Sequence, residues 1–376
     1  MNWITRYLEE TGDFLTIGKV NLLYGPRRVG KTMLIQKLLS ELNVKVFVGD
    51  GDDIELRRIL GSENKTLILS VFGLYNYIFI DEAQRIPNIG WGLKILSDNL
   101  PQCTIVASGS SSFSLSSQVG APLTGRSRTH MLLPISVIEL NKQFGGMYIY
   151  QHLHEFLVYG MYPEVLVAND LNSKTRYLNE LRNSYLLKDI LEMEKIRNSN
   201  KLFDLLRLLA FQIGNEVSLN ELGNSLELSK QTVSRYIDLL EKAFVIIKLG
   251  GFSRNLRKEV TKTNRYYFYD NGLRNSIINN FNFIENRNDI GMLWENFVVT
   301  ERIKKQHYTN IISNNYFWRT YDQKEVDWVE ERNGCLCGYE IKWDNRKHKL
   351  QKTWLETYNN ASLEIIHKDN FLDFVS

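Results

Sequence analysis

The sequence contains few cysteines, and their spacing excludes several kinds of site. Its 376 residues include three, Cys103, Cys335 and Cys337. The close pair is separated by one residue, which fits neither a zinc knuckle nor a thioredoxin-type redox pair. We therefore expect reduced, buried thiols and no disulfide-stapled scaffold.

The sequence also lacks any long apolar run. No stretch reaches the roughly 18 apolar residues that a membrane span needs. The chain starts with MNWITRYLEETGDF, which carries acids where a signal peptide needs an apolar segment. These absences predict a soluble, cytoplasmic protein with no membrane partner.

The chain also carries almost no excess of charge of either sign. Lys and Arg number 46 against 43 Asp and Glu, a net charge of +3, which excludes a protein whose whole surface coats nucleic acid. Hydrophobic residues make up 43% and charged residues 24%, as in ordinary globular proteins. At about 100 to 200 residues per domain, this length predicts two or three folded domains. Any site for a polyanion must therefore be local.

The order of apolar segments predicts an α/β protein. Residues 17–137 alternate short apolar runs with amphipathic segments, as in a parallel sheet covered by helices. No internal repeat or linker rich in Pro, Gly or Ser interrupts the chain. We predict four parts: an α/β core at 1–145, a helical lid or connector at 146–200, short helices followed by strands at 201–270, and an α/β domain at 271–376.

A phosphate-binding loop is the most specific motif. Residues 25–32 read GPRRVGKT, which fits G-x-x-x-x-G-K-[ST] between a predicted strand and a predicted helix. Lys31 is then expected to reach the β- and γ-phosphates of ATP, and Thr32 to bind Mg²⁺. A chance match in a glycine-containing turn is the alternative. The predicted nucleotide-binding residues are Gly25, Pro26, Arg27, Arg28, Val29, Gly30, Lys31, Thr32 and Met33.

Further candidates follow the next predicted strands. The run YIFIDE ends in Asp81, expected to hold Mg²⁺, and Glu82, expected to orient the attacking water. Acids that cap a helix N-terminus are the alternative. Ser110 follows the run TIVASG and is a candidate γ-phosphate sensor, or part of a Ser/Gly turn. Arg126 is a candidate phosphate sensor from within the chain or from a neighbouring subunit of a homo-oligomer.

These motifs carry a resemblance to a known family. The segments GPRRVGKT, YIFIDEAQ, ASGSSS and LTGR, followed by YGMYPEV and YLLKDI, resemble bacterial and archaeal AAA-superfamily ATPases with a nuclease-like C-terminal domain. The resemblance covers nearly the whole chain. It implies an AAA-type core that binds ATP, with Lys31 and Thr32 on the P-loop, Asp81 and Glu82 on the acidic strand and Ser110 at the sensor position. It implies no substrate.

The third part has the pattern of a winged helix. Leu219–Leu222 and Leu228–Leu240 read as helix, turn, helix, with Ser218 and Ser229 as N-caps. Val233, Ile237 and Leu240 are expected to face inward and Lys230, Gln231, Ser234 and Arg235 outward. Basic residues of the predicted wing suit phosphate contacts: Lys248, Arg254, Arg257, Lys258, Lys262 and Arg265. Packing against protein is the alternative use of this module.

The last part resembles a PD-(D/E)xK nuclease core. Glu295 lies on a predicted helix, Asp327 on a strand, and Glu340 and Lys342 on the next strand. In that chemistry two carboxylates hold a metal ion while the lysine helps to activate water. A ladder of surface salt bridges is the alternative. Further cations that could meet a nucleic-acid backbone follow at Arg346, Lys347, Lys349 and Lys352.

Three functional hypotheses result. The first is a Mg²⁺-dependent AAA-type ATPase that couples its nucleotide state to the winged helix and the nuclease-like domain. The second is a DNA-binding regulator switched by ATP with slow or no hydrolysis. The third is an ATP-controlled endonuclease that acts through Glu295, Asp327, Glu340 and Lys342.

Overall fold

The computed structural model describes residues 3–11, 14–110, 122–183, 199–253, 263–320, 323–345 and 352–376. The chain divides into two compact units. The P-loop unit comprises Thr5–Pro134 together with Lys242–Phe244. The large unit comprises residues 1–4, Ile135–Glu241 and Val245–Ser376. The large unit is therefore assembled from three separate segments of the chain.

A five-stranded sheet forms the centre of the P-loop unit. Its strand order is β2-β3-β4-β1-β5, and every neighbouring pair is parallel. The strands are β1 (Val20–Tyr24), β2 (Val46–Asp50), β3 (Tyr77–Asp81), β4 (Thr104–Gly109) and β5 (Ser127–Met131). The helices are α1 (Tyr7–Glu10), α2 (Lys31–Ser40), α3 (Ile54–Leu60), α4 (Lys65–Phe72), η1 (Ala83–Arg85) and α5 (Ile89–Asn99).

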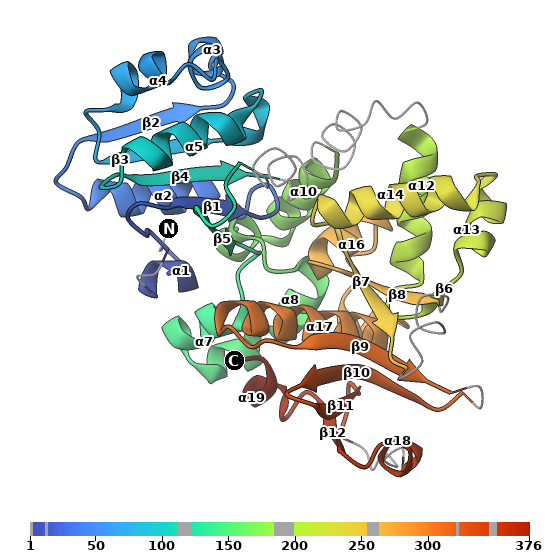
Figure 1. The fold of residues 1–376 in the computed structure, drawn as a ribbon. Coiled ribbons are helices and arrows are strands. Elements are labelled where there is room, and N and C mark those ends of the chain that lie inside the picture. Colours follow the sequence, from blue (N-terminus) through green and yellow to red (C-terminus); the bar gives the residue numbers. More distant parts are fainter. Residues whose placement is uncertain are drawn as a thin grey trace. The chain divides into compact units, whose positions relative to one another are not determined.

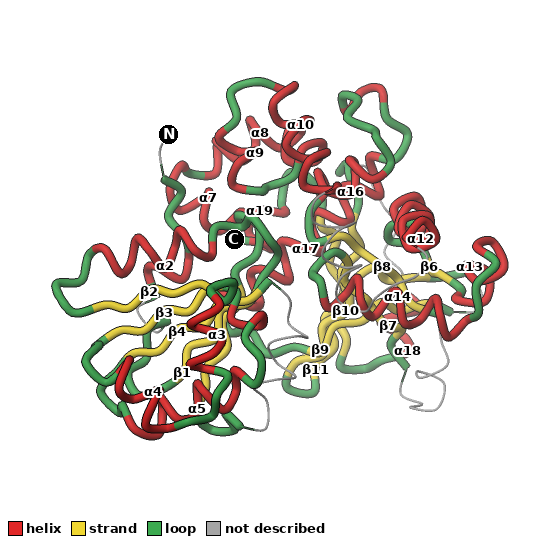
Figure 2. Tube along the Cα trace, turned by 90° about the horizontal axis from the view of Figure 1, so that it is seen from above, coloured by secondary structure: helices red, strands yellow, loops and turns green. Residues whose placement is uncertain are grey.

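Helices cover this sheet on both faces. The views in Figures 1 and 2 place α2 on one face of the strands and α5 on the other. Because both faces are covered, β1 and β4 are buried along their whole length, and their sequences are continuous apolar runs. The predicted α/β core with a parallel sheet is confirmed for this unit. Its parallel strands bring the loops after β1, β3 and β4 to one edge of the sheet.

The large unit begins with helices. Those before the second sheet and within it are α7 (Val137–Phe144), α8 (Gly146–Tyr159), α9 (Pro163–Val167), α10 (Leu171–Leu181), α12 (Ser199–Phe211), α13 (Leu219–Leu226), α14 (Lys230–Lys242) and α16 (Asn271–Ile277). Those that follow are η3 (Ile284–Asn286), α17 (Ile290–Tyr308), α18 (Lys352–Thr357) and α19 (Phe371–Val375).

A seven-stranded sheet runs through this unit in the order β12-β11-β10-β9-β7-β8-β6. Its strands are β6 (Glu216–Val217), β7 (Ile246–Gly251), β8 (Asn264–Phe268), β9 (Asn314–Arg319), β10 (Glu325–Arg332), β11 (Cys335–Ile341) and β12 (Ala361–Ile366). Strands β7 and β9 pair in parallel through Gly250 and Gly251. The sheet therefore continues across position 270, where the sequence predicts a domain boundary.

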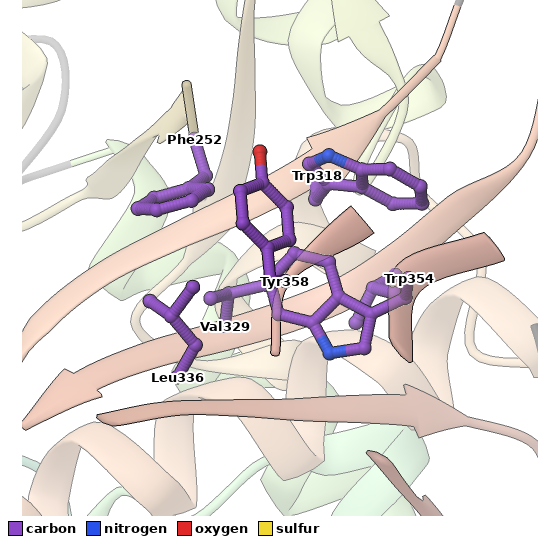
Figure 3. Packing of buried hydrophobic residues seen from close by; sticks show 7 residues of the cluster. Phe252, Trp318, Val329, Leu336, Trp354 and Tyr358 are labelled. Carbon is purple, nitrogen blue, oxygen red and sulfur yellow. The ribbon is translucent and has the colours of Figure 1, made fainter. Parts of the chain in front are cut away.

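An aromatic cluster fills one face of the C-terminal strands (Figure 3). Trp354 of α18 contacts Trp318 and Tyr358, with ring centroids 5.2 and 4.8 Å apart. Val326 and Val329 of β10 both join this cluster, although strict alternation would send them to opposite faces. The pairing of β10 with β9 shifts register between these two residues. The extra residue of this bulge lets two consecutive residues, Asp327 and Trp328, face away from the aromatic cluster.

In the described ranges, no helix is long and apolar enough to cross a membrane.

Candidate functional site

The P-loop connects the end of β1 to the start of α2. Gly25 has φ +152°, and a Cβ at this position would lie 1.9 Å from the carbonyl oxygen of Leu132. Gly30 has φ +92° in the left-handed region and is the N-cap residue of α2. A side chain is excluded at Gly25 by contact and disfavoured at Gly30 by backbone strain. The loop therefore needs both glycines of the motif.

Lys31 is folded back over this loop. Its Nζ donates hydrogen bonds to the carbonyl oxygens of Gly25 and Pro26, both at 2.8 Å. Burial lowers the pKa of Lys31 to about 8, against the opposing influence of the Glu82 and Asp81 carboxylates. The ammonium group is thus held at the mouth of the loop by backbone oxygens that an anionic ligand can replace.

Asp81 receives two hydroxyl groups at the end of β3. Thr32 Oγ1 donates to Asp81 Oδ2 at 2.5 Å, and Ser108 Oγ donates to Asp81 Oδ1. The backbone N–H of Glu82 also donates to Oδ1, at 3.0 Å. These contacts join the start of α2 to the ends of β3 and β4. The structure therefore brings Thr32 and Asp81 together, as a shared metal site would require.

Glu82 lies beside Asp81 in a different environment. Its backbone has φ +46° and ψ +40°, a left-handed conformation that costs energy for a residue with a side chain. Its Oε2 accepts hydrogen bonds from Gln84 Nε2 at 2.5 Å and Ser110 Oγ at 3.3 Å. Gln84 Nε2 also lies 3.3 Å from Ser110 Oγ. The structure thus places Ser110 against Glu82.

The residues present fit a nucleotide with Mg²⁺. The N-terminus of α2, with its backbone N–H groups and macrodipole, suits phosphate oxygens. The Thr32 hydroxyl and the Asp81 carboxylate are the hard oxygen donors that Mg²⁺ prefers. A bound Mg²⁺ would neutralise phosphate charge. The chain itself would supply Lys31 as a phosphate cation and Glu82 as a group that accepts a proton from water.

Other predicted residues of the loop differ in their surroundings. Val29 is fully buried, Arg27 is half-buried, and Arg28 and Met33 are exposed. Arg28 has φ +61° at the turn before Val29. The exposed side chains of Arg28 and Met33 are therefore close in sequence to the phosphate cradle but are not part of its buried interior.

The structure does not bring Arg126 to the P-loop. Its carbonyl oxygen accepts a hydrogen bond from the N–H of Val20, at the start of β1, whereas the P-loop follows the end of that strand. Its Nε donates to Asp98 Oδ1 at 2.5 Å. Because the strands are parallel, Arg126 lies at the sheet edge opposite the loop. A sensor role from within the same unit does not fit this position.

Three residues that sequence reasoning did not select contribute to the site. Arg6 donates to the carbonyl oxygens of Val29 and Leu133, at 2.7 and 2.6 Å, and so anchors the loop. Ser108 and Gln84 position the two acids as described above. Arg6 lies 19 residues before the motif, and no spacing rule could have indicated it. Ser108 and Gln84 each lie two positions from a predicted residue, Ser110 and Glu82, and this nearness in sequence was the available signal.

The predicted helix-turn-helix residues form α13 and α14 in the large unit. Ser218 accepts from the N–H of Glu221, and Ser229 from the N–H of Thr232. Val233, Ile237 and Leu240 of α14 are buried. Lys230, Gln231 and Arg235 are exposed, and Ser234 is half-buried. The predicted wing residues Arg254, Arg257, Lys258 and Lys262 lie outside the described residues.

Arg265 was expected on this basic surface, and that expectation was wrong. Only 4% of Arg265 is exposed. Its side chain extends from β8 to a buried position among carboxylates. The number of basic residues in a segment does not show which face of the strand each side chain occupies. Lys248 on β7 is exposed.

The structure brings the predicted nuclease-like residues close together. Lys342 Nζ lies 3.1 Å from Asp327 Oδ2, and Glu340 is buried on β11. Glu295 projects from α17 and accepts from Tyr267 Oη at 2.7 Å. Burial, and then the charge of Asp327, raises the pKa of Glu295 to about 8. Arg346, Lys347 and Lys349 lie outside the described residues, and Lys352 is exposed at the start of α18.

The parallel five-stranded sheet and its site are consistent with a P-loop domain. Residues 18–141 match the family described as an AAA domain. Residues 150–283 match a domain of unknown function, DUF8612, and residues 290–369 match another, DUF4143. The three matches together cover most of the chain.

Relatives occur in bacteria and archaea. An uncharacterized protein of Methanocaldococcus jannaschii is 24% identical over 89% of this chain and 77% of its own length. One of Mycobacterium tuberculosis is 26% identical over 86% of this chain and 70% of its own. One of Haemophilus influenzae is 26% identical over 87% and 83%. The similarity therefore extends through both units.

Proposed function

We propose that this chain binds ATP with Mg²⁺ at the P-loop and hydrolyses it. The observation that carries the proposal is the contact between the Thr32 hydroxyl and the Asp81 carboxylate, 2.5 Å apart beside the buried Lys31. The match of residues 18–141 to an AAA domain supports it. We further propose that the nucleotide state controls the activity of the large unit.

Each residue has a distinct role in this proposal. Lys31 exchanges its bonds to the Gly25 and Pro26 carbonyls for phosphate oxygens. Thr32 and Asp81 hold Mg²⁺, and Ser108 fixes the orientation of the Asp81 carboxylate. Glu82 accepts the proton of the attacking water, and Ser110 and Gln84 hold Glu82 until that step. Any contribution of Arg126 comes from a neighbouring copy of the chain.

Binding of labelled ATP tests the proposal. We expect Lys31→Ala to abolish saturable binding, because the loop loses its phosphate cation. The matched control is Lys37→Ala, which removes a lysine on the same helix whose Nζ contacts Glu9. Retained binding in the control and loss in Lys31→Ala support the proposal. Equal binding by wild type and Lys31→Ala contradicts it.

A second candidate function is contact with DNA through α14. Its support is the exposure of Lys230 and Arg235 on a helix whose other face is buried. An exposed face of this kind on the second helix of a helix-turn-helix can enter the major groove. Nucleotide occupancy would then switch the affinity of the large unit for DNA.

Charge reversal tests this second function. In fluorescence anisotropy, Lys230→Glu with Arg235→Glu should weaken binding of duplex DNA and reduce the salt slope by about 2. Lys65→Glu, an exposed lysine on α4 of the P-loop unit, is the matched control. An unchanged affinity and salt slope in the double variant would remove α14 as the contact.

We do not extend the proposal to cleavage of nucleic acid. In the described residues, no group of three or more His, Cys, Asp or Glu side chains is arranged to hold a metal ion. Spacing is weak evidence for a metal-dependent nuclease centre, and two of its carboxylates, Glu295 and Asp327, contact Arg265 in the structure.

A further inference from the structure

The carboxylate cluster of the large unit surrounds a cation that belongs to the protein. Arg265 Nη1 lies 3.4 Å from Asp327 Oδ1 and 3.7 Å from Glu295 Oε1. Its Nη2 lies 2.6 Å from Glu325 Oε2. One guanidinium group therefore contacts carboxylates from both α17 and β10.

The sheet fixes this guanidinium in place. Arg265 lies on β8 between its two neighbours, opposite Leu249 of β7 and Glu216 of β6. Its guanidinium carbon is 4.8 Å from the ring centroid of Phe317. Burial acts to lower the pKa of Arg265, but Tyr267 and the carboxylates of Glu295, Asp327 and Glu325 hold it above its usual range. The group stays charged, and its charge needs the cluster.

Both oxygens of Asp327 and one oxygen of Glu295 already contact donors of the protein. Asp327 Oδ1 faces Arg265, while Asp327 Oδ2 accepts from Lys342 Nζ at 3.1 Å and from the N–H of Ile341 at 2.9 Å. Glu295 Oε1 accepts from Tyr267. Asp327 directly follows Val326 on β10 and therefore faces away from the aromatic cluster, toward these partners. Asp327, the central carboxylate, therefore does not suit a divalent cation, because two protein cations already share it.

We propose that Arg265 takes the place of a divalent metal ion in this cluster. The domain then has the framework of a nuclease core without its metal, and its carboxylates serve to bind β8 to α17 and β10. A metal ion near Asp327 would meet the positive charges of both Arg265 and Lys342. The large unit should therefore bind no divalent metal ion at Asp327. This inference does not depend on ATP binding.

Manganese binding, followed by electron paramagnetic resonance of free Mn²⁺, tests the inference. The full chain is used without nucleotide in an Asp81→Asn background, so that the carboxylate of the P-loop unit does not contribute. We expect no bound Mn²⁺ in this protein and no change on adding Asp327→Asn. Arg265→Met, which removes the charge but keeps an apolar side chain, should gain one Mn²⁺ per chain that Asp327→Asn abolishes.

The matched control is Arg265→Lys, which keeps a cation and should gain no Mn²⁺. Thermal unfolding provides a second readout: Mn²⁺ should raise the Tm of Arg265→Met and leave that of the parent unchanged. If Arg265→Met does not fold, Mn²⁺ binding by the Asp81→Asn parent protein with and without Asp327→Asn still tests the inference. Mn²⁺ bound by the parent and lost in Asp327→Asn would overturn the inference. If Arg265→Met folds but binds no Mn²⁺, the proposal that Arg265 takes the place of a metal ion is wrong.

Discussion

Two adjacent acids at the end of β3 have different partners. Asp81 is held by the hydroxyls of Thr32 and Ser108 and faces the start of α2. Glu82 is turned away by its left-handed backbone and contacts Gln84 and Ser110. Because a metal-binding carboxylate and a proton-accepting carboxylate need separate positions, this divergence suits the proposed hydrolysis.

The first prediction concerns these positions. Glu82→Gln should bind ATP normally and lower kcat by about 100-fold or more, because the proton acceptor is lost. Gln84→Ala should lower kcat by a smaller factor with little change in KM, because it only positions Glu82. Steady-state kinetics measure both. Gln36→Ala, an exposed glutamine on α2, is the control for Gln84. Wild-type turnover by Gln84→Ala would exclude the positioning role.

A buried ion pair joins α17 to β10. Arg302 Nε and Nη2 donate to Glu330 Oε1 and Oε2 at 2.6 and 2.9 Å. Trp328 Nε1 and Gln306 Nε2 also donate to Glu330 Oε1. Glu330 thus faces α17, while its neighbour Val329 faces the aromatic cluster of Figure 3. Strand β10 therefore contacts α17 on one face and the aromatic cluster on the other.

The second prediction is that Glu330→Gln lowers the free energy of unfolding by about 3–5 kcal/mol at neutral pH, because Arg302 stays buried without its counter-charge. Burial acts to raise the pKa of Glu330, but its bonds to Arg302 hold it below its ordinary value. A lowered folded pKa means that this stabilisation is complete above the unfolded pKa of about 4.5 and is lost as pH falls through the folded value.

Urea unfolding measured across acid pH checks this prediction. The wild type should lose stability toward low pH more steeply than Glu330→Gln. Glu331→Gln, a half-buried neighbour on the same strand, is the control and should change stability little. If the free energy of unfolding falls equally toward acid pH in wild type and Glu330→Gln, the Arg302–Glu330 pair is not the cause of the pH dependence.

The molecule as a whole is divided into two compact units, and the large unit is built from segments on both sides of the P-loop unit in sequence. Each unit has its own sheet and its own buried core. The candidate nucleotide site lies wholly within the P-loop unit, and the Arg265 cluster wholly within the large unit. Ligands of one unit should therefore stabilise that unit directly.

The third prediction is that calorimetry resolves two unfolding transitions and that ATP with Mg²⁺ raises one of them. At 100 times the Kd, linkage gives about 2.7 kcal/mol of stabilisation. The shifted transition should be insensitive to ligand in Lys31→Ala. The transition that Glu330→Gln lowers should be the other one. A single transition that responds to both changes would mean that the units unfold together.

Features that depend on neighbours along the chain could be predicted from the amino-acid pattern. The P-loop, the apolar strands and the acids after β3 are local patterns, and a parallel α/β order brings their ends to one edge of the sheet. The resemblance to a nuclease core grouped Glu295, Asp327, Glu340 and Lys342, and strand alternation placed Glu340 and Lys342 on one face.

The contact partners of these residues could not be predicted from the pattern, because they come from distant parts of the chain. Arg6 anchors the P-loop from outside the motif, and Arg126 lies at the far edge of the sheet. Arg265, one basic residue among several in the sequence, is the cation at the centre of the carboxylate cluster. Charge and spacing are properties of a segment, whereas the partner of a buried charge is set by strand order and register.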